Sequence, residues 1–111
     1  MTSIQIFQPS RMLTSVNGTE LLDGIDLALE EGYQHFLIDM QDAMFMDSSG
    51  LSFLVTAYKR VRSAGGTLSL CSLKGQAAML VEITRMDKML DIYSDRDAFQ
   101  RAINTRQDIS G

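Results

Sequence analysis

The stretch Met46-Asp47-Ser48-Ser49-Gly50-Leu51 lies where a predicted strand gives way to a predicted helix. An apolar strand at 34–40 and a short apolar step at 43–46 come before it. From Leu51 to about Ala64, apolar residues recur every three or four positions, which is typical of an amphipathic helix. The stretch is therefore predicted to form the N-terminus of that helix.

A helix N-terminus leaves backbone N–H groups without intrahelical partners and carries partial positive charge. Asp47 and Ser48 are both residue types that cap such donors. A hydroxyl at this position is also a potential phosphate acceptor, because a phosphate there would face the same N–H groups. Ser48 thus has two interpretations, a simple helix cap or a phosphorylation site, and Ser49 and Ser52 are alternative acceptors.

Strand and helix patterns alternate along the rest of the chain. We expect strands at 4–7, 12–16, 34–40, 67–71 and 90–93, and helices at about 19–31, 48–64, 74–84 and 94–104. This order predicts an α/β fold with a mostly parallel sheet of four to five strands and about four helices. The 111 residues form one predicted domain, with a core at about 4–104 and a loose tail at 105–111.

The composition narrows the classes of function. Hydrophobic residues make up 45% and charged residues 22%, as in a globular domain, and the formal net charge of -4 argues against direct binding of nucleic acid. Cys71 is the single cysteine, so no internal disulfide forms and a reducing compartment is expected. We find no signal peptide and no stretch long enough to span a membrane, which predicts a cytoplasmic protein.

The sequence offers little catalytic chemistry. A serine nucleophile needs a general base, and the single histidine, His35, begins the strand whose far end leads to Ser48. With one His and one Cys, no metal-ligand spacing is present, although Asp39, Asp42 and Asp47 would be the residues of a magnesium-binding phospho-receiver site as an alternative. We therefore predict no enzyme activity, no cofactor and no metal.

For several apolar side chains near the junction and beyond it, the sequence must be interpreted as placing them either in the core or on the surface. Phe53 falls outside the apolar stripe of its helix, so it is either an exposed partner contact or half buried by a neighbouring loop. Most of the first methionine group is assigned to the core, whereas Met79 and Met86 are predicted to lie on the surface. The first group consists of Met40, Met44 and Met46.

The sequence resembles the anti-sigma factor antagonists, the single-domain members of the bacterial STAS group. The matching residues are Phe45-Met46-Asp47-Ser48-Ser49-Gly50-Leu51, then Tyr58-Lys59, then Ala64-Gly65-Gly66-Thr67-Leu68 before a strand. The likeness covers about residues 34–100. It departs from the family before the first helix, where relatives have Gly-x-Leu-Asp and this chain has Met12-Leu13-Thr14.

The resemblance implies a phosphorylation-switched binding module. Ser48 is the position that matches the phosphorylated serine. The implied partners are an anti-sigma factor that is also the serine kinase, which the unphosphorylated form binds, and a PP2C-type phosphatase. The expected partner-binding residues are Asp47, Ser49, Gly50, Phe53 and Met79. The expected oligomeric state is a monomer or weak dimer, and the alternative function is a STAS scaffold or transporter-associated module without a serine switch.

Overall fold

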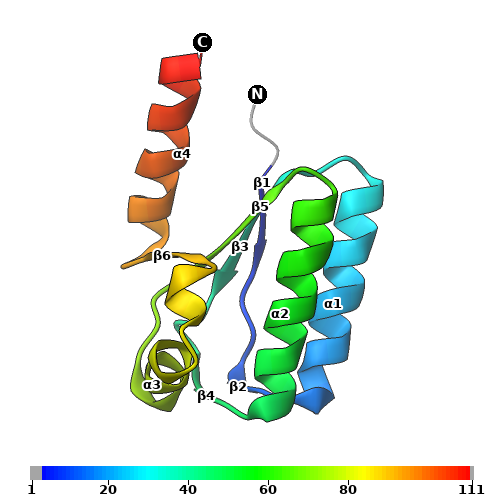
Figure 1. Ribbon diagram of the computed structural model, residues 1–111, viewed down its shortest axis with the longest axis vertical. Helices are drawn as coiled ribbons and strands as arrows, with labels where there is room; N and C mark the ends of the chain where they lie inside the picture. The colour runs from blue at the N-terminus through cyan, green and yellow to red at the C-terminus, as the bar shows by residue number, and fades with distance from the viewer. Residues whose placement is uncertain (1–3, 111) are drawn as a thin grey trace.

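A computed structural model describes residues 4–110 of the chain, with side chains as far as Thr105. Figure 1 shows the arrangement of the elements. The strands are β1 (Ile4–Phe7), β2 (Arg11–Leu13), β3 (His35–Asp39), β4 (Ala43–Met46), β5 (Thr67–Cys71) and β6 (Asp91–Tyr93). The helices are α1 (Ser15–Glu30), α2 (Ser48–Ser63), α3 (Gly75–Ile83), the 3₁₀ turn η1 (Met86–Lys88) and α4 (Arg96–Ser110).

Four strands form one sheet in the order β1-β3-β5-β6, and every pairing in it is parallel. Ile38 in the centre pairs with Phe7 on one side and with Leu70 on the other. The short strands β2 and β4 form a separate parallel pair beyond the carboxyl ends of β1 and β3. The predicted α/β class with a mostly parallel sheet is confirmed.

The sheet is covered differently on its two faces (Figure 1). Helices α1 and α2 pack side by side on one face, over a large cluster that includes Phe36, Ile38 and Leu70. Helix α4 covers the other face over a smaller cluster that includes Leu37 and Cys71. Neighbouring residues of one strand therefore serve two separate apolar clusters, as the period of two in a strand requires.

Helix α1 begins earlier than the sequence predicts. The helix begins at Ser15 and not at about 19, and the strand expected at 12–16 is wrong for 14–16, which form the cap and first turn of α1. Thr14 is the cap, because its hydroxyl accepts from the N–H of Val16 at 3.1 Å and its own N–H donates to the Asn17 side chain at 3.0 Å. This reciprocal capping explains the difference, since a turn-forming Asn in the third helical position stabilises the helix start.

The other helix ends follow the predicted chemistry more closely. Gly65 has φ +81° directly after the cap of α2, the left-handed conformation with which many helices end. Asp95 accepts from the N–H of Ala98 at 2.8 Å at the start of α4. Helix α4 continues to Ser110, and Gly111 lies outside the described residues, so the loose tail at 105–111 stays a prediction.

Candidate functional site

Helix α2 begins at Ser48 because Asp47 caps it. The backbone of Asp47 is extended, and its Oδ1 accepts from the N–H of Gly50 at 2.8 Å. The carbonyl of Asp47 accepts the first intrahelical bond, from the N–H of Leu51 at 3.0 Å. The cap is thus Asp47 and not Ser48, and the Ser48 side chain lies exposed at the first helical position.

The first turn of α2 lies against the backbone of β2. A Cβ atom added to Gly50 would lie 2.1 Å from the Leu13 carbonyl oxygen, so only glycine allows this approach. The N–H of Asp47 donates to the same Leu13 oxygen at 3.3 Å. Gly50 is buried, so it fixes the position of Ser48 and offers a partner almost no surface of its own.

An apolar hollow borders the helix start. It has a volume of about 330 Å³, and its lining residues are Met12, Thr14, Phe45, Met46, Asp47 and Gln76. Phe45 is 56% exposed and Met12 is 47% exposed. Gln76 on α3 accepts from the N–H of Met46 at 2.9 Å, which joins α3 to the last residue before the cap.

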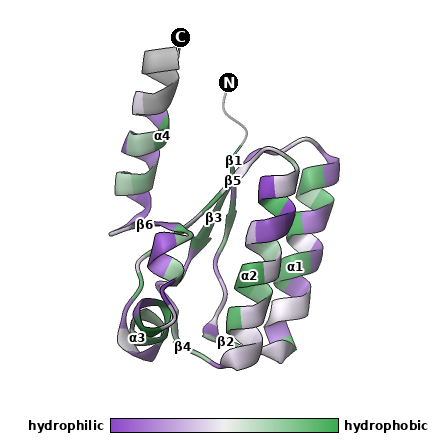
Figure 2. Cartoon of the chain, viewed as in Figure 1, coloured by the Kyte–Doolittle hydropathy of each residue, from purple (hydrophilic) through white to green (hydrophobic). Residues whose placement is uncertain are grey.

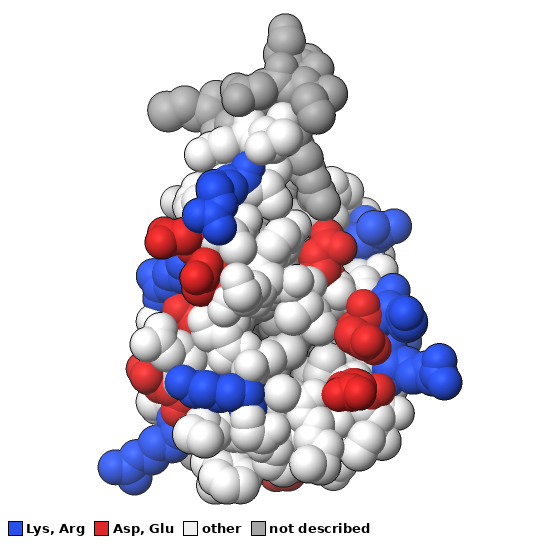
Figure 3. Space-filling view, turned by 90° about the vertical axis from the view of Figure 1, so that its left-hand side faces the viewer, with Lys and Arg blue, Asp and Glu red and all other residues white. Residues whose placement is uncertain are grey.

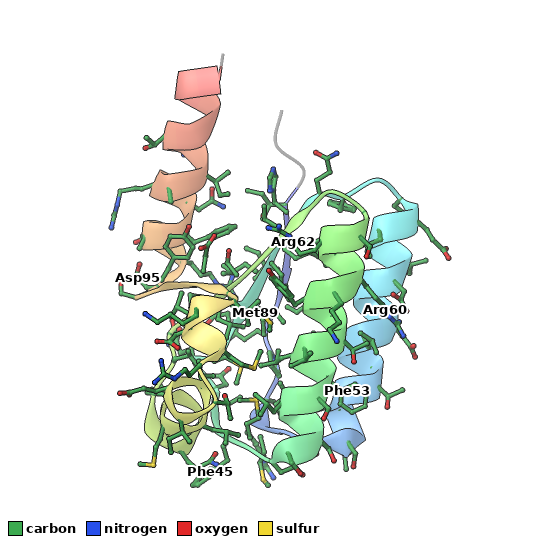
Figure 4. The ribbon with its side chains drawn as sticks, viewed as in Figure 1. Phe45, Phe53, Arg60, Arg62, Met89 and Asp95 are labelled. Atoms are coloured by element: carbon green, nitrogen blue, oxygen red, sulfur yellow. The ribbon has the colours of Figure 1, made fainter. Side chains whose placement is uncertain are left out.

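Figure 4 places Phe45 at the lower end of the molecule, well away from the basic upper part of α2 that carries Arg60 and Arg62. Figure 2 shows the same contrast in hydropathy, with hydrophilic residues gathered in the upper part of α2 and paler residues at its lower end. Large exposed apolar side chains that gather beside a polar junction are typical of a protein-binding surface. Sequence reasoning did not find this hollow, because its residues come from β2, β4 and α3.

The remaining predicted site residues are not all in one place. Ser49 is half buried beside Ser48, and Ser52 is exposed one turn further on. Phe53 is half buried, and its ring packs on Gly18 of α1, where an added Cβ would lie 2.2 Å from the ring (Figure 4). Helix α1, and not a loop, therefore covers this aromatic side chain.

The methionines divide between core and surface. Met40 and Met46 are buried, as expected for most of the first group, whereas Met44 is 45% exposed. Met79 is 60% exposed on α3, which confirms the predicted surface position. The same prediction is wrong for Met86, which is 3% exposed because the turn η1 directs it into the main core.

The described side chains do not form an activated nucleophile beside Ser48. His35 lies at the opposite end of β3 from the junction, and its Nδ1 is 2.8 Å from the hydroxyl oxygen of Thr67. Cys71 is buried, and burial raises the pKa of its thiol to about 11. A reactive thiolate is thus disfavoured at this position.

The three carboxylates of the phospho-receiver alternative have separate roles. Asp39 pairs with Arg96, Asp42 accepts from Gln8, and Asp47 caps α2. Within residues 4–105, no group of three His, Cys, Asp or Glu side chains is arranged to hold a metal ion. Figure 3 shows Lys and Arg mixed with Asp and Glu on the face formed by α3 and α4, so this face carries no continuous basic surface.

These features define a small α/β module that presents a serine and an apolar hollow at one helix start. Residues 2–99 match the STAS domain, and the chain belongs to that family. The family resemblance seen in the sequence is confirmed. Among the described residues, no helix has the length and apolarity needed to cross a membrane.

Two curated relatives carry names that describe a function. An anti-sigma F factor antagonist of Paenibacillus polymyxa is 26% identical over 78 residues, which is 66% of this chain and 67% of the relative. An anti-sigma-B factor antagonist of Bacillus subtilis is 36% identical over 55 residues, half of each chain. The matched segments thus span one half to two thirds of these relatives.

Two solved structures share the fold. The crystal structure of TM1081 from Thermotoga maritima, a candidate anti-sigma factor antagonist, has a TM-score of 0.85 at 21% identity and covers 94% of this chain and 90% of that chain. A sulfate transporter family protein from Wolinella succinogenes has a TM-score of 0.76 at 15% identity, with 86% and 80% covered. At these identities the two structures bear on the fold alone.

Proposed function

We propose that this STAS protein is an anti-sigma factor antagonist controlled by phosphorylation of Ser48. Unphosphorylated Ser48 and the hollow beside it bind an anti-sigma factor that is also a serine kinase, and this binding frees the target of that factor. The observation that carries the proposal is the exposed serine at the first position of α2, directly after Asp47, which lines the hollow together with Phe45 and Met12. The names of the curated relatives support the same role.

The hollow supplies the apolar part of the contact. Aromatic and methionine side chains at the centre of an interface contribute much of the binding free energy when a partner removes them from water. Phe45 and Met12 are available for this purpose, since both are about half exposed. A partner that covers them also covers Ser48, which lies directly after the lining residue Asp47.

Phosphorylation changes the same surface without refolding the domain. The phosphate adds about -1.5 to -2 charges at pH 7. Within the domain, the N-terminus of α2 accommodates this charge, a favourable interaction of about 0.3 to 1 kcal/mol at an exposed position. Because Asp47 already satisfies the Gly50 N–H, the cap does not depend on the Ser48 hydroxyl.

Across an interface the added charge is unfavourable. The carboxylate of Asp47 is adjacent, and burying a dianion beside it without a compensating cation costs several kcal/mol. A loss of about 2.7 kcal/mol weakens binding a hundredfold. A PP2C-type phosphatase then restores the binding form.

The experiment is site mapping with the kinase that is encoded beside this protein or co-purifies with it. After incubation with that kinase and ATP, mass spectrometry should place the phosphate on Ser48, and Ser48→Ala should lose the label. Ser15→Ala is the matched control, because Ser15 is the exposed first residue of the neighbouring helix α1. Full labelling of Ser48→Ala would refute the assignment, and label on Ser49 or Ser52 would move the acceptor.

A further inference from the structure

Helix α4 is attached to the sheet through its own small apolar cluster. Phe99 and Ile103 on α4 are buried against Leu37 of β3 and Cys71 of β5. The ring of Phe99 also meets Tyr93 edge-on, with 5.6 Å between ring centroids. This cluster lies on the face of the sheet opposite α1 and α2 (Figure 1). Losing it would leave the larger cluster under α1 and α2 in place.

A polar network attaches the first residue of α4 to the sheet. Arg96 donates from Nε to Oδ2 of Asp39 at 2.6 Å, and the Asp39 side chain is 2% exposed. The same guanidinium donates from Nη2 to the Gln8 side chain. Gln8 in turn donates to Asp42 at 2.8 Å. One arginine thus joins α4 to the ends of β1 and β3.

The same network fixes the turn that leads to Ser48. Asp39 is the last residue of β3, and its other oxygen, Oδ1, accepts from the N–H of Gln41 at 3.0 Å. Asp42, held by Gln8, is the last residue before β4. Strand β4 ends at Met46, one residue before the cap of α2. The contacts that fix α4 and the contacts that fix this turn therefore share one buried carboxylate.

We propose that α4 is a releasable element whose docking through Arg96 controls the order of residues 40–48. In the docked state, Arg96 neutralises Asp39 and positions Gln8, so the turn and β4 are held in one arrangement. In the released state, the Asp39 carboxylate loses its cation and either draws in water or reorients, which loosens its bond to Gln41. Because coupling between two sites is reciprocal, events at the Ser48 junction change the docking of α4 by the same factor.

A small cluster held by one ion pair is the kind of unit that opens locally without global unfolding. The pair between Arg96 and Asp39 is half covered, with side-chain exposures of 44% and 2%. Removing the arginine leaves a buried carboxylate without a cation, which is costly in the docked state alone. Loss of Arg96 therefore shifts the equilibrium toward the released state.

Cys71 makes the release measurable, because it is the single cysteine and α4 covers it. We would compare Arg96→Gln with Arg60→Gln, which removes an exposed ion pair, the one between Arg60 and Asp26. We expect Arg96→Gln to react with a disulfide reagent at Cys71 at least tenfold faster than wild type at the same global stability. Arg60→Gln should stay within twofold of wild type.

Hydrogen exchange tests the coupling in the same samples. In Arg96→Gln, peptides from 96–105 and from 40–48 should exchange at least tenfold faster, while peptides from the middle of α1 and α2 keep wild-type rates. Equal Cys71 reactivity in Arg96→Gln and Arg60→Gln would overturn the release of α4. Faster exchange at 96–105 with unchanged exchange at 40–48 would overturn the coupling.

If Arg96→Gln does not fold by circular dichroism, Gln8→Ala replaces it, because it breaks the link to Asp42 and leaves the buried ion pair in place. Its expected effect is about threefold at 40–48, and no change there would contradict the proposal. The regulatory meaning of this device rests on the proposed function of Ser48. These measurements need neither a partner nor a phosphate, so a failure of the device and a failure of the proposed function give separate results.

Discussion

Helices α1 and α2 start in similar ways, and the two starts lie next to each other at one end of the molecule (Figure 1). Thr14 caps α1 and is followed by exposed Ser15, whereas Asp47 caps α2 and is followed by exposed Ser48. Thr14 and Asp47 even line the same hollow. Local polarity and exposure therefore do not separate the two serines.

Packing behind the two first turns does separate them. In α2, Gly50 lies against the backbone carbonyl of Leu13, so the backbone of β2 fixes the position of the first turn of α2. In α1, Gly18 lies against the ring of Phe53, a side chain and not the backbone. A rigid start presents its serine in one position, which lowers the entropy cost of docking. We infer that a partner recognises the N-terminus of α2 and not that of α1.

The largest difference is expected in binding to the anti-sigma partner. Ser48→Glu should weaken the affinity about a hundredfold, or about 2.7 kcal/mol, because it places a second carboxylate beside Asp47 in the contact. Ser15→Glu should change the affinity less than threefold. Titration calorimetry with the purified partner measures both, and comparable losses for the two variants would remove the distinction between the helix starts.

The second prediction concerns the glycines behind the two starts. Gly50→Ala should lower the free energy of unfolding by about 1–3 kcal/mol, because the new methyl group meets a backbone carbonyl that cannot move away. Gly18→Ala should cost less, since the atoms it meets belong to a side chain and not to the backbone, and alanine favours the helix by about 1 kcal/mol. Urea denaturation measures both variants, and a larger loss for Gly18→Ala would contradict the packing argument.

The third prediction is that the two caps contribute about equally to the stability of the domain. Asp47→Ala and Thr14→Ala should each lower the free energy of unfolding by about 1 kcal/mol, because each removes a side-chain acceptor from a first-turn N–H. Thermal denaturation provides the measurement. Asp47→Ser is the control and should recover most of the loss at α2, since serine also caps; no recovery would show that Asp47 acts through its charge.

The smallest expected effect is on the stability of the protein at acid pH. It comes from Asp39 beside α4 and not from either helix start. Burial alone would raise the pKa of Asp39, but hydrogen bonds from Arg96 and from the Gln41 N–H bring it below its ordinary value of 3.8. A carboxyl whose pKa is lower in the folded state contributes stability that is present above its unfolded pKa and lost as the pH falls through the folded pKa.

Wild type should therefore lose this contribution below about pH 4, by a few tenths of a kcal/mol to about 1 kcal/mol, since Arg96 is partly exposed. The variant Arg96→Gln should show a shallower loss over the same range. Urea denaturation between pH 3 and pH 6 gives the two slopes, and identical slopes would mean that Arg96 does not set the pKa of Asp39.

Sequence reasoning works best where local chemistry decides the structure. The start of α2 follows from Asp47 and the apolar stripe behind it, and Gly65 follows from the need for a left-handed residue after the helix. It fails for α1, because Asn17 and Gly18 are turn residues in most settings and become helical only through the reciprocal cap with Thr14.

Contacts between distant segments are outside the reach of such reasoning. Gln8 and Arg96 are 88 positions apart, and no local pattern joins them. The hollow beside Ser48 takes Met12 from β2 and Gln76 from α3, so it exists only once the small β2-β4 pair has formed. Met86 was predicted to lie on the surface. It is buried because of a single 3₁₀ turn, which the helical pattern does not predict.

The central claim is that one phosphate on Ser48 changes a docking surface and leaves the rest of the domain unchanged. The most direct test is the affinity of the anti-sigma partner for the protein before and after stoichiometric phosphorylation at Ser48. We predict at least a hundredfold weaker binding after phosphorylation, with amide spectra unchanged away from residues 45–52. Equal affinities, or spectral changes throughout the sheet, would contradict the account.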